Sequence, residues 1–258
     1  MKPIKVIVFS SKPYSPFVLK PLKQAKNIRI IKVIGDKKQL EDLNLREIKV
    51  DIGIVAAFGV ILKPNLLKLP LKGILNIHPS LLPQYRGSSP IQTAILNGDN
   101  ETGVTIIKMD EQIDHGLIVK QAKAKISKDD TNQTLYQKLF TKGTKMIIEL
   151  LPDYLEGKIK PKPQKHQEAT YTQKLTKESG QIDWQKDNQY NERFIKAMHP
   201  WPGAWTDIKI KNENRRLKIL KSHLESKNLI IDQVQLEGKK PVSFKQFKEG
   251  YPEVNLKS

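Results

Sequence analysis

The residues best suited to chemistry in this sequence are an asparagine, a histidine and an aspartate. Asn76 and His78 lie two positions apart at the end of an apolar run that predicts a β-strand. Because side chains alternate between the two faces of a strand, both should point to the same side. An amide N–H and a protonated imidazole there can donate to one oxygen and stabilise negative charge that develops on it. Asp114, in the loop after a later predicted strand, is the natural carboxylate to pair with His78 and orient its ring.

Taken singly, each of these residues also has an ordinary structural explanation. A histidine at a strand end is more often a structural residue with one satisfied nitrogen, and an aspartate close before a glycine is more often part of a turn. Taken together, they fit acyl transfer to an amine. That reaction needs a held carbonyl, donors for its oxygen and a group that takes the amine proton. The pattern alone leaves both explanations open.

The elements that must position these residues predict an α/β fold. Short β-rich runs alternate with helical stretches through the first half of the chain, and near-continuous apolar strands between helices are typical of a doubly wound, mostly parallel, Rossmann-like sheet. In such sheets ligands bind at the carboxyl ends of the strands, and Pro79 should end the strand that carries Asn76 and His78. The predicted strands are 4–9, 29–34, 51–57, 73–78, 102–108 and 117–124, and the predicted helices are 15–26, 63–69, 88–98 and 131–155.

The second part of the chain has a different composition. Residues 158–168 are polar, lysine-rich and broken by two prolines, which is typical of a linker. We therefore predict a catalytic domain over residues 1–157, a linker over 158–184 and a small, reduced, β-rich C-terminal domain over 185–258. The C-terminal domain should contain a helix near 188–198 and strands near 204–210, 216–222 and 228–236.

The charge of the chain has two interpretations. Its 45 Lys and Arg exceed its 27 Asp and Glu, which gives a net charge of +18. Such an excess favours polyanionic partners such as nucleic acid. Nearly all the basic residues are lysines spread along the whole chain, so the excess also fits a compositional habit of the organism, and a net charge does not locate a binding patch.

Composition also excludes several classes of protein. The chain has no cysteine, so disulfides, thiolate metal sites and cysteine nucleophiles are ruled out, as expected in a reducing cytoplasm. No apolar run is long enough to cross a bilayer, so we expect no membrane partner.

Longer stretches around the candidate residues resemble the 10-formyltetrahydrofolate-dependent formyltransferase family. The resemblance is carried by Asn76-Ile-His-Pro-Ser-Leu-Leu-Pro-Gln-Tyr-Arg-Gly-Ser-Ser-Pro-Ile-Gln92 and by Asn97-Gly-Asp-Asn-Glu-Thr-Gly-Val-Thr-Ile-Ile-Lys-Met-Asp-Glu-Gln-Ile-Asp114-His-Gly116. Further matches lie at 55–59, 169–178, 182–184, 193–204 and 238–243. Within the family, the portions 86–92 and 101–106 are most similar to the branch that acts on methionyl-initiator tRNA.

This resemblance implies a site and its ligands. It gives Asn76, His78 and Asp114 the family's catalytic positions and gives the Ser80-Leu81-Leu82-Pro83 turn the folate-contacting position. It further implies 10-formyltetrahydrofolate as co-substrate, no metal and initiator methionyl-tRNA as partner. We also expect a monomer with a cytoplasmic location. Leu81, Leu82 and the loop 58–62 would line an apolar slot for the flat folate ring. Arg86 would position the acceptor or the loop, or is an ordinary surface arginine.

Two departures from the family bear on the acceptor. The basic, glycine-containing loop expected after the second strand is missing at 34–40, and the region 217–236 is too short for the family's complete C-terminal barrel. One alternative is therefore an amino-sugar nucleotide N-formyltransferase that uses the same donor. The other is a non-catalytic folate- or RNA-binding protein on a degenerate scaffold.

Overall fold

The computed structural model describes residues 2–44 and 48–256, and these form two compact units. Unit 1 comprises Met1–Pro90, Asn100–Ile126 and Leu135–Gln173, and unit 2 comprises Ile91–Asp99, Ser127–Thr134 and Lys174–Ser258. The predicted division into a catalytic domain, a linker and a C-terminal domain stays a prediction. Most of the segment 158–184 is nevertheless built into unit 1, up to Gln173.

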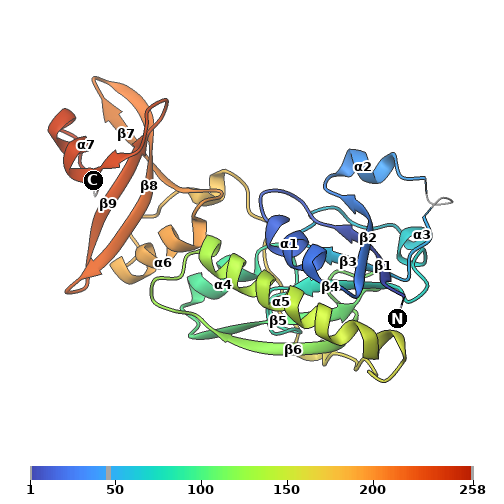
Figure 1. Cartoon of the computed structure of the whole chain (residues 1–258). Helices are drawn as coiled ribbons and strands as arrows, with labels where there is room; N and C mark the ends of the chain where they lie inside the picture. Colours follow the sequence, from blue (N-terminus) through green and yellow to red (C-terminus); the bar gives the residue numbers. More distant parts are fainter. Residues whose placement is uncertain (1, 45–47, 257–258) are drawn as a thin grey trace. The chain divides into compact units, whose positions relative to one another are not determined.

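Unit 1 is built on a six-stranded sheet with the order β2-β1-β3-β4-β5-β6 (Figure 1). The first four strands pair in parallel, whereas β5 runs antiparallel to β4 and β6 antiparallel to β5. This confirms the predicted mostly parallel α/β sheet. The strands are β1 (Ile4–Phe9), β2 (Ile28–Ile34), β3 (Ile52–Ala56), β4 (Ile74–His78), β5 (Glu101–Lys108) and β6 (Leu117–Lys125).

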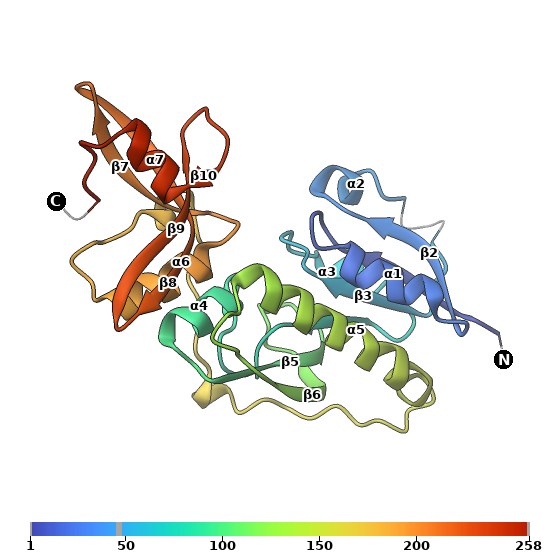
Figure 2. The ribbon, with the colours of Figure 1, turned by 60° about the vertical axis from the view of Figure 1, so that its left-hand side comes forward.

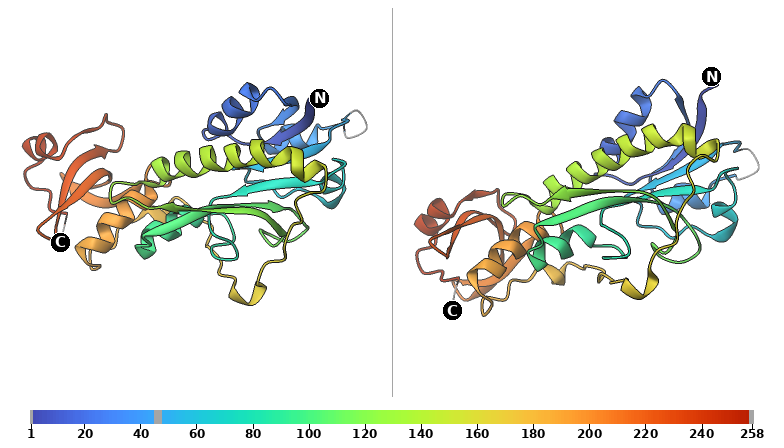
Figure 3. Two further views of the ribbon diagram at one scale, coloured as in Figure 1. Left: turned by 60° about the horizontal axis from the view of Figure 1, so that its bottom comes forward. Right: turned by 90° about the horizontal axis from the view of Figure 1, so that it is seen from below.

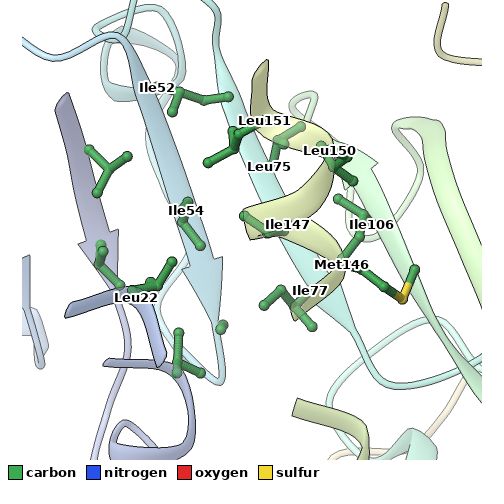
Figure 4. Packing of buried hydrophobic residues seen from close by; sticks show 14 of the residues in the cluster. Leu22, Ile52, Ile54, Leu75, Ile77, Ile106, Met146, Ile147, Leu150 and Leu151 are labelled. Atoms are coloured by element: carbon green, nitrogen blue, oxygen red, sulfur yellow. The ribbon is translucent and has the colours of Figure 1, made fainter. Parts of the chain in front are cut away.

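One face of this sheet is covered by α1 (Pro16–Gln24) and α5 (Asn132–Leu155), which lie on the same side of it in Figure 3. Figure 4 shows Ile147 and Leu151 of α5 packed against side chains of β3, β4 and β5. Ile147 is fully buried, and removing such a side chain from a core costs about 2–5 kcal/mol. This helical layer therefore fixes the position of β4, the strand that carries the candidate residues.

The other face is covered by two short helices and their loops. Strand residues of the opposite parity, such as Ile7 and Ile74, pack here against Leu66 of α3 (Pro64–Leu67) and Leu40 of α2 (Lys37–Glu41). Helix α2 was not among the elements predicted from the sequence. Its first turn is capped by Asp36, whose carboxylate accepts from the Gln39 N–H at 2.8 Å.

Unit 2 contains an antiparallel sheet with the order β10-β9-β8-β7, as Figure 2 shows. Its predicted strands are present, but β8 is longer than expected. At Lys211-Asn212 and at Ser226-Lys227 both residues have positive φ, as two-residue type I′ hairpins require. The elements are α4 (Pro90–Asn97), α6 (Asn188–Met198), β7 (Ala204–Ile210), β8 (Glu213–Glu225), β9 (Asn228–Leu236), β10 (Val242–Ser243) and α7 (Phe244–Gly250).

Helix α4 packs with unit 2 although its sequence lies in the first half of the chain. Arg193 of α6 donates from Nε to the carbonyl of Leu96 in α4, at 3.1 Å. Two short 3-10 turns, η2 (His166–Glu168) and η3 (Glu178–Gly180), complete the described elements.

Candidate active site

Strand β4 places two of the three candidate residues on one face. Leu75 and Ile77 point into the core beneath α5, so Asn76 and His78 point to the opposite side, as the period of a strand requires. Asn76 is flanked by Val55 of β3 and Ile107 of β5, so the strand is fixed on both sides. His78 is 3% exposed.

The third candidate residue, Asp114, lies in the loop that follows β5. Because β5 runs antiparallel to β4, it ends beside Leu75, at the end of β4 that lies away from His78. The chain then returns through residues 109–116, and Asp114 adopts the left-handed conformation with a φ of +49°. Non-glycine residues seldom do so, although aspartate tolerates it better than most, and such residues cluster at functional sites.

The three side chains converge on one oxygen atom. Asn76 Nδ2 donates to Asp114 Oδ1 at 3.3 Å, and His78 Nδ1 lies 3.4 Å from the same Oδ1. Two donors are thus aimed at a single anionic oxygen, which is the arrangement that stabilises a developing oxyanion. Both distances are longer than that of an ideal hydrogen bond.

The backbone determines how the His78 ring is used. Its Nε2 lies 2.9 Å from the carbonyl oxygen of Tyr85. A carbonyl oxygen can only accept, so Nε2 carries a proton and Nδ1 is the nitrogen that faces the aspartate. The contact between His78 Nδ1 and Asp114 is favourable only when a proton lies between them. The ring is therefore arranged to hold or to pass a proton at Nδ1.

The carboxylate of Asp114 is held from its other side as well. Oδ2 accepts a hydrogen bond from the Gly87 N–H at 2.8 Å. The aspartate side chain is 13% exposed and its partner His78 is 4% exposed, so the pair is largely shielded from water. Electrostatic interactions act more strongly where water is excluded.

The turn predicted to contact folate, Ser80–Pro83, is only partly accessible from outside. Ser80 and Leu82 are buried, and their backbone groups are bound internally by Thr105 and Gln121. Leu81 and Pro83 are partly exposed. Contact of these four residues with folate stays a prediction.

Two apolar side chains near this edge of the sheet are largely exposed. Ile61, in the loop after β3, is 77% exposed, and Ile113, next to Asp114, is 60% exposed. Exposed apolar side chains of this size can cover the face of a flat ring.

Arg86 is not a surface residue, which corrects one of its two predicted roles. It is 2% exposed, and its guanidinium donates to Gln164 Oε1 at 2.7 Å and to the Tyr171 hydroxyl at 3.3 Å. The backbone groups of Tyr85 and Gly87 and the side chain of Gln164 were not among the predicted site residues. No local signal marks them, because Gly87 and Gln164 act through distant parts of the chain and the Tyr85 carbonyl meets His78 only through the fold of the turn between them.

Within residues 2–44 and 48–256, no group of three or more His, Cys, Asp or Glu side chains is arranged to hold a metal ion. The described helices include none that is both long and apolar enough to span a membrane.

The fold and the site define an α/β protein with a centre suited to acyl transfer. The chain belongs to the formyltransferase family: the family model described as formyl transferase matches residues 32–151, and the model of its C-terminal domain matches residues 174–229. The expected family membership is thereby confirmed.

The similar curated proteins carry the name methionyl-tRNA formyltransferase. One from Methylacidiphilum infernorum is 40% identical over 227 residues, which cover 79% of this chain and 71% of that protein. One from Roseiflexus sp. (strain RS-1) is 47% identical over 162 residues, which cover 63% of this chain. The chain spans about half the length of the Roseiflexus relative, namely 50%.

Solved structures agree on the fold. A methionyl-tRNA formyltransferase from Clostridium thermocellum superposes with a TM-score of 0.70 at 20% identity, over 90% of this chain and 98% of that one. HypX from Aquifex aeolicus in complex with tetrahydrofolic acid gives 0.76 at 17% identity, over 97% of this chain and 48% of that one. At these identities the likeness shows a shared fold.

Proposed function

We propose that this protein transfers a formyl group from 10-formyltetrahydrofolate to the amino group of methionyl-initiator tRNA. The observation that carries the proposal is the convergence of Asn76 Nδ2 and His78 Nδ1 on one anionic oxygen, Asp114 Oδ1. The names of the relatives support the acceptor. The acceptor would place the enzyme in the cytoplasm, and we expect it to act as a monomer.

In the proposed reaction, the acceptor amine attacks the formyl carbon and a carbon–nitrogen bond forms. Negative charge develops on the formyl oxygen, where the amide of Asn76 and the protonated ring of His78 donate to it. Asp114 takes the proton that the amine loses, directly or through water. The bond from the carbon to the donor nitrogen then breaks, and that nitrogen is protonated to give tetrahydrofolate.

The geometry determines which atom of His78 and which atom of Asp114 would take part in the reaction. Nε2 of His78 is occupied by the Tyr85 carbonyl, so Nδ1 alone is directed at the reaction centre. Asp114 Oδ2 is occupied by Gly87, so Oδ1 alone is free to exchange partners with the substrate. Each catalytic side chain therefore presents one atom to the reaction.

The acceptor assay tests this proposal. The purified full chain is mixed with formyl donor and charged initiator tRNA, and formylmethionine is measured. Asn76→Ala, His78→Ala and Asp114→Ala should each lower turnover at least about a hundredfold, because each removes a donor or its partner. Asp153→Ala, which removes an exposed carboxylate of α5 that pairs with Lys158, should leave turnover unchanged. Near-normal turnover in a site variant would remove that residue from the mechanism.

A second candidate function keeps the donor and changes the acceptor to an amino-sugar nucleotide. It is favoured by the connection after β2, where α2 forms one capped turn of helix at the place expected for the family's basic loop. A sugar 3N-formyl transferase, WlaRD, also shares the fold with a TM-score of 0.66. The relatives' names support it less. Offering both acceptors to the same preparation separates the two, and folate binding without turnover on either would indicate a non-catalytic protein.

A further inference from the structure

Gln164 is a buried residue in an exposed segment. It is 5% exposed, whereas its neighbours from Lys165 to Glu168 are all exposed. A long polar side chain is seldom buried unless its hydrogen-bonding groups are satisfied. The segment has a lysine- and proline-rich composition that would suit a linker, so nothing in its own neighbourhood explains why this one side chain turns inward.

Every hydrogen-bonding position of the Gln164 amide is used. Nε2 donates to the carbonyl oxygens of Asp114 at 2.9 Å and Gly116 at 2.8 Å. Oε1 accepts from Arg86 Nη2 at 2.7 Å and from Arg86 Nε at 3.3 Å. Carbonyls only accept and a guanidinium only donates, so the amide can have only this orientation.

These contacts belong to a closed circuit of hydrogen bonds that links Arg86, Gln164, Asp114 and Gly87. Arg86 fixes Gln164, and Gln164 fixes the backbone of Asp114 and Gly116. The Asp114 carboxylate in turn accepts a hydrogen bond from the N–H of Gly87, the residue that directly follows Arg86. Three segments that are far apart in the sequence are thereby tied together on one side of the site.

The circuit matters because Asp114 has an unfavourable backbone conformation. A left-handed non-glycine residue costs about 1–2 kcal/mol and persists only where the surroundings hold it. Gln164 binds the carbonyl of Asp114 itself and the carbonyl two residues later. Without these two bonds, the loop has less to keep the carboxylate in line with Asn76 and His78.

We propose that Gln164 is a positioning residue that orients the Asp114 carboxylate, with Arg86 fixing the Gln164 amide. The catalytic part of this inference rests on the proposed formyl transfer. Gln164 itself touches no reacting atom. Its effect on the reaction passes through the position of Asp114.

Gln164→Glu is the sharpest variant. A glutamate keeps acceptors for Arg86 but cannot donate to the two carbonyls when it is ionised. We expect kcat to fall about 10- to 100-fold, since small misplacements of a catalytic group have effects of this size, with the KM for the acceptor little changed. Gln167→Glu is the matched control, because it makes the same change at an exposed position of η2 and should leave kcat unchanged.

Two further measurements separate positioning from a general structural role. In an Asp114→Ala background, adding Gln164→Ala should lower kcat no further, because the group being positioned is already gone. The Gly87 amide proton resonance reports the Asp114 carboxylate directly. It should move in Gln164→Glu and stay in place in Gln167→Glu.

Three results would overturn the inference. They are wild-type kcat in folded Gln164→Glu, multiplicative effects in the double variant, and an unmoved Gly87 resonance. If Gln164→Glu does not fold, Arg86→Lys takes its place, because lysine keeps the charge but cannot hold Oε1 with two donors. If the wild type formylates no amine while the Gly87 resonance still moves, the proposed function falls and the positioning stands.

Discussion

Asp114 is the central residue of the candidate site, because it contacts both other candidate side chains and is itself bound at three atoms. Oδ1 faces the donors, Oδ2 accepts from Gly87, and the carbonyl oxygen accepts from Gln164. Its side chain keeps an exposed fraction of 13%. A carboxylate fixed in this way need not reorganise when charge develops, which is the main source of electrostatic catalysis.

A pH dependence is expected at His166, which supports Arg86. Arg86 Nη2 lies 2.8 Å from His166 Nδ1, and a guanidinium only donates, so this contact needs an unprotonated Nδ1. Loss of hydration lowers the pKa of His166 from 6.5, and the nearby His115 and Arg86 lower it further, while Asp110 opposes them. The neutral ring is therefore favoured in the folded protein. This stability is complete above about pH 6.5 and is lost as the pH falls through the lowered pKa.

His166→Gln tests that expectation, since glutamine can accept from Arg86 but does not titrate. The melting temperature of the wild type should fall more between pH 7.5 and 5 than that of the variant. Equal falls in the two proteins would show that the contact between Arg86 and His166 makes no pH-dependent contribution.

Among the elements, β5 contains a glycine, Gly103, against which neighbouring segments pack closely. A β-carbon added at Gly103 would lie 2.2 Å from Leu81 Cδ2 and 2.6 Å from the Ala122 carbonyl oxygen. The turn after β4 and the neighbouring strand β6 thus both approach the backbone of β5 closely. Only glycine permits this approach without displacing Leu81, one of the residues predicted to contact folate.

Gly103→Ala should therefore destabilise the protein by about 1–3 kcal/mol, the usual range for an overpacked core position. Urea unfolding measures the change, and the KM for the folate donor should rise as Leu81 shifts. Gly250→Ala is the control, because nothing lies within 4 Å of its added methyl group. A stable Gly103→Ala with an unchanged donor KM would show that the turn adapts freely.

At the scale of the whole molecule, the salt dependence of tRNA binding tests whether the net charge of +18 serves a nucleic-acid partner. Phosphate contacts release counterions, so the affinity for a tRNA falls steeply as salt rises, with a log–log slope set by the number of phosphates engaged. The KM for charged tRNA should rise severalfold or more between about 50 and 200 mM salt, whereas the KM for the donor should change little. A flat acceptor KM would favour a small acceptor and would assign the lysine excess to composition.

The sequence by itself determined the local features of this protein. Apolar runs marked the strands of unit 1, and the spacing of Asn76 and His78 put both on one face, because alternation along a strand is a property of neighbouring residues. The resemblance around Asp114 added the expected third member. The absence of a basic loop after β2 stays a prediction, and the helical turn α2 in that connection was not predicted.

Only the tertiary structure decided which distant groups meet. It buried Arg86 and turned Gln164, in an apparent linker, inward to donate to the Asp114 carbonyl. It also folded the turn after β4 so that the Tyr85 carbonyl meets His78. It also extended β8 to a tight turn and joined α4 to unit 2. Periodicity and composition report whether a residue is buried locally, whereas a hydrogen bond between residues 50 or more positions apart depends on how whole segments pack, and that leaves no local pattern to read.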